Sequence, residues 1–137
     1  MRIFLLFLAF LGLGGCAWLP AHDPNQAWVD LHTRPSNELL AVEVDDKPLD
    51  DSRFFQVSPG AHQLQARLRF DVAASNIGGD SEPLPRDCQL VLDYAGFNAG
   101  QRYRLEAGNI GFRAWSKLYD EQNRVLARGR EGRCGAL

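Results

Sequence analysis

The amino-acid sequence predicts an all-β protein, an antiparallel β-sandwich of about seven strands that follows a cleaved N-terminal signal peptide. Three observations support this prediction. Apolar and polar residues alternate with a period of two through most of the chain, and short segments rich in Gly, Pro, Asn and Asp separate these stretches. No stretch after the N-terminus has the 3.6-residue period of a helix.

The N-terminus differs from the rest of the chain. Arg2 supplies a positive charge, and an uninterrupted apolar run occupies residues 3–13. A membrane-spanning helix needs roughly 20 apolar residues, whereas the apolar region of a signal peptide has about 7 to 15 and ends in small residues. Residues 1–15 are therefore expected to be a signal peptide and not a transmembrane anchor.

The segment ends in Leu13-Gly14-Gly15-Cys16, which resembles the lipobox of bacterial lipoprotein precursors. The resemblance implies cleavage before Cys16, a diacylglycerol on its sulfur and a further acyl chain on the new N-terminus. Two or more acyl chains hold a protein durably on a membrane. Ala17 stands where lipoproteins retained in the inner membrane carry Asp, so the resemblance implies an outer-membrane protein that faces the periplasm. The alternative is an ordinary cleaved signal in which Cys16 is incidental.

Residues 16–37 are expected to be the lipidated N-terminus and a tether. Three prolines interrupt this polar stretch, and Pro fixes φ and removes a hydrogen-bond donor, which disfavours regular structure. Within the stretch, Trp28 is expected to pack on the domain. The sandwich domain is then expected to occupy residues 38–137.

The expected strands are short and separated by turns. They cover residues 39–44, 54–57, 61–70, 88–94, 101–106, 110–119 and 124–128. The clearest alternation lies in 61–70, and the last two segments should form a hairpin. In 110–119, one face carries the residues expected inside, which are Ile110, Phe112, Ala114, Ser116 and Leu118. Residues 71–87, rich in Gly and Pro, are expected to be a long surface loop, either a contact site or merely disordered.

Two segments resemble the PEGA-type surface domain. Residues 42–48 and 57–64 match its pattern of a strand, a Val-Asp-Gly turn, and then a Pro-Gly-x-His turn into the next strand. This chain has Asp46 where that family prefers Gly, and it lacks the PEGA tetrapeptide. The resemblance covers 39–70 and implies a β-sandwich, with no catalytic residues to transfer.

Two cysteines remain after the signal, and they are far apart in sequence. Cys88 and Cys134 are expected to form a disulfide, because an exported chain folds in an oxidising compartment. The alternatives are two free thiols or pairing with another protein. Neither Cys has a second Cys or a His pair at the spacing of a zinc site.

Charge and motifs exclude several functions. The net charge of −2, without clustered Lys and Arg, argues against nucleic acid. The sequence carries none of the common nucleophile or zinc-hydrolase motifs, and no cofactor is expected. Four aspartates near a predicted turn offer a weak calcium alternative, although their spacing is not that of an EF-hand. They are Asp45, Asp46, Asp50 and Asp51.

A histidine and a basic-aromatic stripe remain as candidate functional groups. His62 follows a Pro-Gly turn and is expected to bind neighbouring backbone and lock that turn, because no partner for general-base chemistry is evident. The stripe is Arg113, Trp115, Lys117 and Tyr119 on one face of 110–119. Such side chains favour interfaces, but large aromatic residues in strands are more often packed, so we expect Trp115 and Tyr119 to be core.

Taken together, these features favour a non-catalytic interaction or scaffold module of the cell envelope, lipid-anchored through Cys16, with an envelope protein as partner. One alternative is a module that binds cell-wall glycan or a metal ion. The other is a hydrolase with an unfamiliar site.

Overall fold

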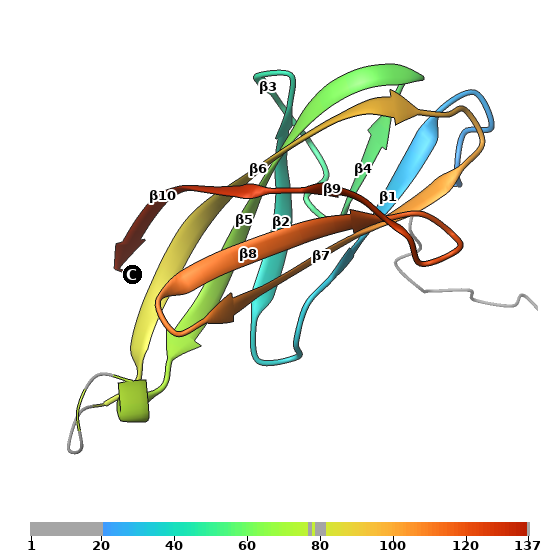
Figure 1. Ribbon diagram of the computed structural model, residues 1–137. Helices are drawn as coiled ribbons and strands as arrows, with labels where there is room; N and C mark the ends of the chain where they lie inside the picture. Colours follow the sequence, from blue (N-terminus) through green and yellow to red (C-terminus); the bar gives the residue numbers. More distant parts are fainter. Residues whose placement is uncertain (1–20, 77, 79–81, 137) are drawn as a thin grey trace, which may run out of the picture.

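The computed structural model describes residues 21–76, 78 and 82–136 (Figure 1). The expected signal peptide and Cys16 lie outside this range. The described chain forms ten strands and one 3₁₀ turn, η1, at Ala74–Asn76. The strands are β1 Ala27–His32, β2 Glu38–Val44, β3 Lys47–Pro48, β4 Phe54–Val57, β5 Gly60–Val72, β6 Leu84–Phe97, β7 Arg102–Ile110, β8 Arg113–Tyr119, β9 Val125–Arg128 and β10 Arg130–Ala136. Among these residues there is no helix long and apolar enough to cross a bilayer.

The strands form two five-stranded sheets that pack face to face, so the predicted all-β sandwich is confirmed (Figure 1). Sheet A has the order β4-β1-β7-β8-β9, and sheet B has the order β10-β6-β5-β2-β3. All neighbouring strands are antiparallel except β1 and β7, which run parallel.

The core between the sheets is built from the alternating positions of the strands. In β5, the side chains of Leu64, Ala66 and Leu68 are at most 1% exposed, while the intervening Gln65 and Arg67 face outward. Each large side chain buried in this way stabilises the fold by roughly 1.5 to 3 kcal/mol. The predicted alternation in 61–70 is therefore confirmed.

The predicted tether contains a strand, and the expectation for this part of the chain is wrong. β1 lies inside sheet A, between β4 and β7, with Ala27 and Val29 fully buried in the core. The reason is a period-two pattern in Ala-Trp-Val-Asp-Leu-His that fits a sheet whose inner face is apolar. Trp28 packs on the domain as expected, with 1% of its surface exposed.

The segment just before β1 is also fastened to the domain. The Asp23 backbone N–H donates to Gln56 Oε1 at 3.2 Å, and the Gly100 N–H donates to the Gln26 carbonyl at 3.0 Å. His22 Nε2 lies 2.8 Å from the same carbonyl. The folded domain thus begins near residue 22.

The predicted loop at 71–87 is shorter than expected. β5 extends to Val72, and β6 begins at Leu84, so Asp71 pairs with Pro85 and Val72 with Leu84. Pro85 is compatible with a strand here because β10 ends opposite Arg86, which leaves β5 as the only described strand beside Pro85.

The chain turns between β7 and β8 where a continuous strand was expected. Gly111 has φ of 59°, a left-handed conformation that suits Gly, and the turn exposes 79% of Ile110 and 39% of Phe112. The expected inward placement of Ile110 and Phe112 is therefore wrong, whereas that of Ala114, Ser116 and Leu118 is confirmed. The hairpin of β8 and β9 is also confirmed.

Cys88 and Cys134 pair across sheet B, as predicted. They face each other on β6 and β10 with their Cα atoms 4.1 Å apart, and the sulfurs lie at bonding distance. Closing a loop with a sequence separation of 46 contributes about 4 kcal/mol in the chain-entropy model. The bond holds β10, a strand with no alternating apolar pattern, at the edge of the sheet.

Candidate functional site

The predicted stripe of Arg113, Trp115, Lys117 and Tyr119 lies on the outer face of sheet A, which we call the A face. Trp115, Lys117 and Tyr119 are half-buried and Arg113 is exposed. Neither aromatic residue belongs to the core between the sheets, and the described residues form no third layer over this face. The expectation that Trp115 and Tyr119 are core residues is wrong, because β8 turns its alternate side, Ala114, Ser116 and Leu118, inward.

Cations on the A face lie beside its aromatic rings. Lys117 Nζ is 5.6 Å from the centre of the Trp115 ring, and the Arg104 guanidinium carbon is 4.6 Å from that of Tyr119. Arg104 also pairs with Glu106, with Nε and Oε1 2.9 Å apart. These contacts restrain the long side chains before a partner arrives. Less side-chain entropy is therefore lost on binding than would be lost by unrestrained side chains.

Trp115 packs against bare backbone of the neighbouring strand. It is in register with Gly108 of β7, and a Cβ atom at position 108 would lie 2.8 Å from the indole. Only glycine therefore allows the ring to approach this closely. Among the described residues, the indole N–H of Trp115 finds no hydrogen-bond acceptor, whereas that of Trp28 donates to Asp30 at 2.8 Å.

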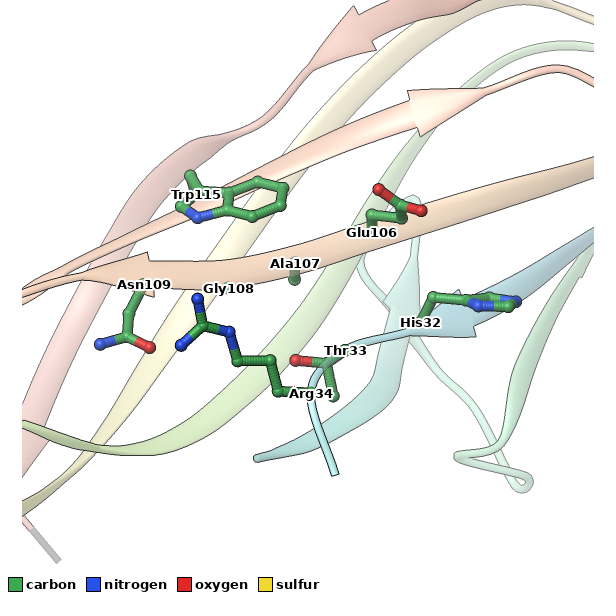
Figure 2. Close-up of a pocket in the computed structure, with 8 residues that line it drawn as sticks. All are labelled: His32, Thr33, Arg34, Glu106, Ala107, Gly108, Asn109 and Trp115. Atoms are coloured by element: carbon green, nitrogen blue, oxygen red, sulfur yellow. The ribbon is translucent and has the colours of Figure 1, made fainter. Parts of the chain in front are cut away.

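Beside Trp115, the sheet opens into a hollow of about 310 Å³ (Figure 2). The parallel pairing of β1 with β7 ends at His32 and Glu106, and β7 continues without β1 beside it. The hollow lies where the two strands part. It is lined by His32, Thr33, Arg34, Glu106, Ala107, Gly108, Asn109 and Trp115. Of the predicted stripe, only Trp115 reaches it.

The polar groups around the hollow include both hydrogen-bond donors and hydrogen-bond acceptors. Asn109 Nδ2 donates to the Gly111 carbonyl at 3.0 Å, which leaves its Oδ1 as an acceptor. Glu106 binds Arg104 through Oε1 and keeps a second carboxylate oxygen. Arg34 is exposed and forms no ion pair within the described part of the chain. Sequence reasoning missed Arg34, Glu106 and Asn109, because only the end of a parallel strand pair brings them together.

At the other candidate site, His62 connects two turns. Its Nδ1 lies 2.6 Å from Asp45 Oδ2, and its Nε2 lies 2.7 Å from the Ser58 carbonyl and 3.1 Å from Ser58 Oγ. Asp45 also accepts the Gln63 backbone N–H at 2.8 Å; that bond first, and the one to His62 second, hold the pKa of the Asp45 carboxyl below its usual 3.8. The prediction that His62 binds backbone and locks the turn is confirmed.

The set of Ser58, His62 and Asp45 has the order of a nucleophile, a base and an orienting acid, and Asp45 is a partner that sequence reasoning missed. However, the nearer neighbour of Nε2 is a carbonyl oxygen, which can only accept a hydrogen bond. A ring nitrogen that donates to this carbonyl has no lone pair for the Ser58 hydroxyl proton. The geometry therefore supports a structural clasp and not nucleophile activation.

The four aspartates of the weak calcium alternative do not converge. Asp45 is engaged with His62 and Gln63. Asp51 accepts two bonds from the Arg53 side chain, at 2.9 and 2.6 Å, and these bonds lower the pKa of its carboxyl to about 2. Cys88, Glu131 and Cys134 are the one group of potential ligands that lies close together in the described residues, and its two sulfurs are those of the disulfide.

Comparison with known proteins returned no matching family model, no similar curated protein and no similar solved structure.

Proposed function

We propose that this chain is a non-catalytic binding module of the bacterial cell envelope, held on the periplasmic side of the outer membrane by acyl chains on Cys16. Its contact surface for an envelope partner is the A face. The observation that carries the proposal is the half-buried basic-aromatic stripe of Trp115, Lys117 and Tyr119, which lies on a sheet face with no third layer. Trp, Tyr and Arg are enriched among the few residues that supply most of the binding energy in protein interfaces.

The opposite face of the sandwich supports this choice by contrast. On the outer side of sheet B, Arg67 and Arg69 both pair with Asp87, and Arg130 pairs with Asp93. Charges that are already paired gain little from a new partner, since exposed ion pairs contribute about 1 kcal/mol or less and must be desolvated on binding. The A face also carries ion pairs, Arg102 with Asp30 and Arg104 with Glu106, but beside them it offers ring surface and an indole N–H that has no acceptor among the described residues.

A short tether would place one end of the sandwich beside the membrane. Because the domain is fastened from His22 onward, only the five residues 17–21 lie between Cys16 and His22, and this stretch spans at most roughly 20 Å. The end of the sandwich at which β1 begins then faces the lipid. β1 runs away from that end, so the hollow beyond His32 lies on the membrane-distal half of the A face.

The non-catalytic part of the proposal is supported by the hydrogen bonds of His62. Its Nε2 lies closest to a backbone carbonyl, so the Ser58 hydroxyl lacks an available base. In the described residues no other serine lies within hydrogen-bond distance of a histidine ring. The structure therefore offers no specific reason to favour the hydrolase alternative.

The experiment is site-specific photo-cross-linking in the native host. A cross-linking amino acid is placed at Lys117 on the A face and, as the matched control, at Gln65 on the outer face of sheet B. We expect a specific adduct from position 117 and none from 65, and we expect the Cys16→Ala variant to leave the membrane fraction and lose the adduct. Equal adducts from both positions would contradict the A face as the contact surface. An unacylated chain that stays soluble without the substitution would contradict the anchor.

A further inference from the structure

The hollow beside Trp115 owes its existence to the unequal lengths of two paired strands. β1 ends at His32, and the chain leaves the sheet through Thr33 and Arg34 into a turn at Pro35 and Ser36. Pro lacks a backbone donor and cannot continue the hydrogen-bonded ladder. β7 runs on to Ile110, so its backbone from Ala107 forms the floor of a space that a longer β1 would fill.

One wall of the hollow is a fixed aromatic surface. The Trp115 indole is placed against Gly108 and beside Lys117, so its orientation is set before any ligand arrives. Figure 2 shows the indole at the upper side of the hollow and Arg34 across the β7 backbone from it. A preorganised ring loses little entropy on binding, and its face suits the C–H groups of a flat ligand.

The hollow is lined by both hydrogen-bond donors and acceptors. The donors include the Arg34 guanidinium and the indole N–H. The acceptors include Asn109 Oδ1 and the free oxygen of Glu106. A purely apolar ligand would leave these groups without partners. A phosphate-rich ligand calls for several converging cations, whereas Arg34 is the only arginine or lysine among the lining residues.

We propose that the hollow binds a saccharide, one or two sugar rings of an envelope glycan. A sugar ring presents C–H groups on its face and hydroxyls at its edge, and each hydroxyl both donates and accepts, which matches an indole wall surrounded by mixed polar groups. The volume of about 310 Å³ is at the lower end of the range for ligand sites, roughly 300 to 1,000 Å³, and so suits a short segment of glycan. This inference rests on the proposed function and specifies the ligand of the same face.

The test measures binding of the full-length protein, purified from membranes in detergent, to two probes. One probe is the tetramer of N-acetylglucosamine, followed by isothermal titration calorimetry, and the other is isolated cell-wall sacculi, followed by co-sedimentation. We expect both to bind, and we expect Trp115→Ala to weaken binding about tenfold or more. Asn109→Ala should weaken it as well. The matched control is Phe112→Ala, which removes an exposed aromatic ring from the turn before β8, outside the hollow and outside the stripe, and should change binding by no more than about twofold.

Three outcomes would overturn the saccharide site. They are no binding of either probe, binding that Trp115→Ala leaves intact, and binding of sacculi but not of the tetramer, which would place the ligand on the peptide part of the wall. If cross-links from position 117 persist in these cases, the proposed function stands without this ligand. Conversely, if the native chain carries no acyl groups but binds the tetramer through Trp115, the proposed membrane anchor is contradicted and the saccharide site stands.

Discussion

The two halves of the A face each contain a tryptophan, and the two are held in different ways. On the half where β1 begins, Trp28 is 1% exposed, stacks on Phe54 with ring centres 4.1 Å apart, and lies 5.4 Å from the Arg102 guanidinium. Its N–H donates to Asp30. On the half beyond the end of β1, Trp115 is half-buried over Gly108, and its N–H has no acceptor among the described residues. One ring completes the fold, and the other is left for a ligand.

The largest expected effect is the loss of stability from removing the buried ring. Trp28→Ala should lower the free energy of unfolding by about 3 to 5 kcal/mol, as truncation of a buried Trp generally does. Trp115→Ala should lower it by about 1 kcal/mol or less, because the ring is only partly covered. Urea unfolding followed by circular dichroism measures both. Equal losses would mean that the two halves of the A face do not differ in role.

A smaller loss of stability is expected from a substitution at Gly108, where Trp115 packs against the backbone of β7. Gly108→Ala should destabilise the domain by about 1 to 3 kcal/mol and displace the indole, because the new Cβ would lie within 2.8 Å of the ring. Gly135→Ala on β10 is the control, since a Cβ there meets no atom within 4 Å. The same unfolding curves apply, together with the near-ultraviolet circular dichroism of Trp. An unchanged spectrum in Gly108→Ala would contradict the close packing.

The half of the A face that contains Trp28 should also respond to acid. Burial alone would raise the pKa of the Asp30 carboxyl, but hydrogen bonds from Arg102 and Trp28 outweigh it and hold this pKa below 3.8. A carboxyl with a lowered pKa stabilises the fold above its unfolded value and loses that contribution as the pH falls through its folded value.

Asp30→Asn should therefore cost about 1 kcal/mol or less at pH 7, and its difference from wild type should shrink as the pH falls below 3.8. Thermal melts across this pH range measure the difference. A gap between the two proteins that widens in acid would show that the assigned partners do not act on Asp30.

The smallest expected effect concerns the cation beside Trp115. Lys117→Ala should reduce stability by about 0.5 kcal/mol, the usual size of an exposed cation–π contact, and should alter the fluorescence of Trp115. Arg128→Ala, which removes the exposed residue opposite Lys117 on β9, serves as control. An identical change in both variants would assign the effect to general surface charge and not to the ring.

Where the chain alternates regularly, the sequence was sufficient to predict the strands, as in β2, β4 and β5. The prediction failed where prolines flank a strand or where a turn interrupts the alternation. β1 has the alternating pattern but is bracketed by prolines, which were given more weight than Ala27, Val29 and Leu31. At Ile110 the alternation continues across a turn that only the positive φ of Gly111 reveals.

The candidate site could be predicted only in part. The sequence identified Trp115 because period two fixes which strand residues share a face. It could not identify Arg34 or Asn109 as neighbours of Trp115, because their proximity depends on where the pairing of β1 with β7 stops. The contact of His62 with Asp45 likewise depends on the register of β2 and β5, which shifts at an irregularity between Ala41 and Glu43.

The parallel pairing of β1 with β7 also has a kinetic consequence. β1 is among the first parts of the domain to be synthesised, yet its neighbour β7 follows roughly 70 residues later. Bringing such distant segments together has a loop-closure cost that must be met before the contacts form, so this pairing is slow compared with the hairpins. Until β7 arrives, the edge of β1 that faces away from β4 has no strand to pair with, and its backbone N–H and C=O groups stay unpaired. A chain truncated before residue 102 should therefore present β1 as an open sheet edge and aggregate, whereas one lacking only β10 should keep sheet A.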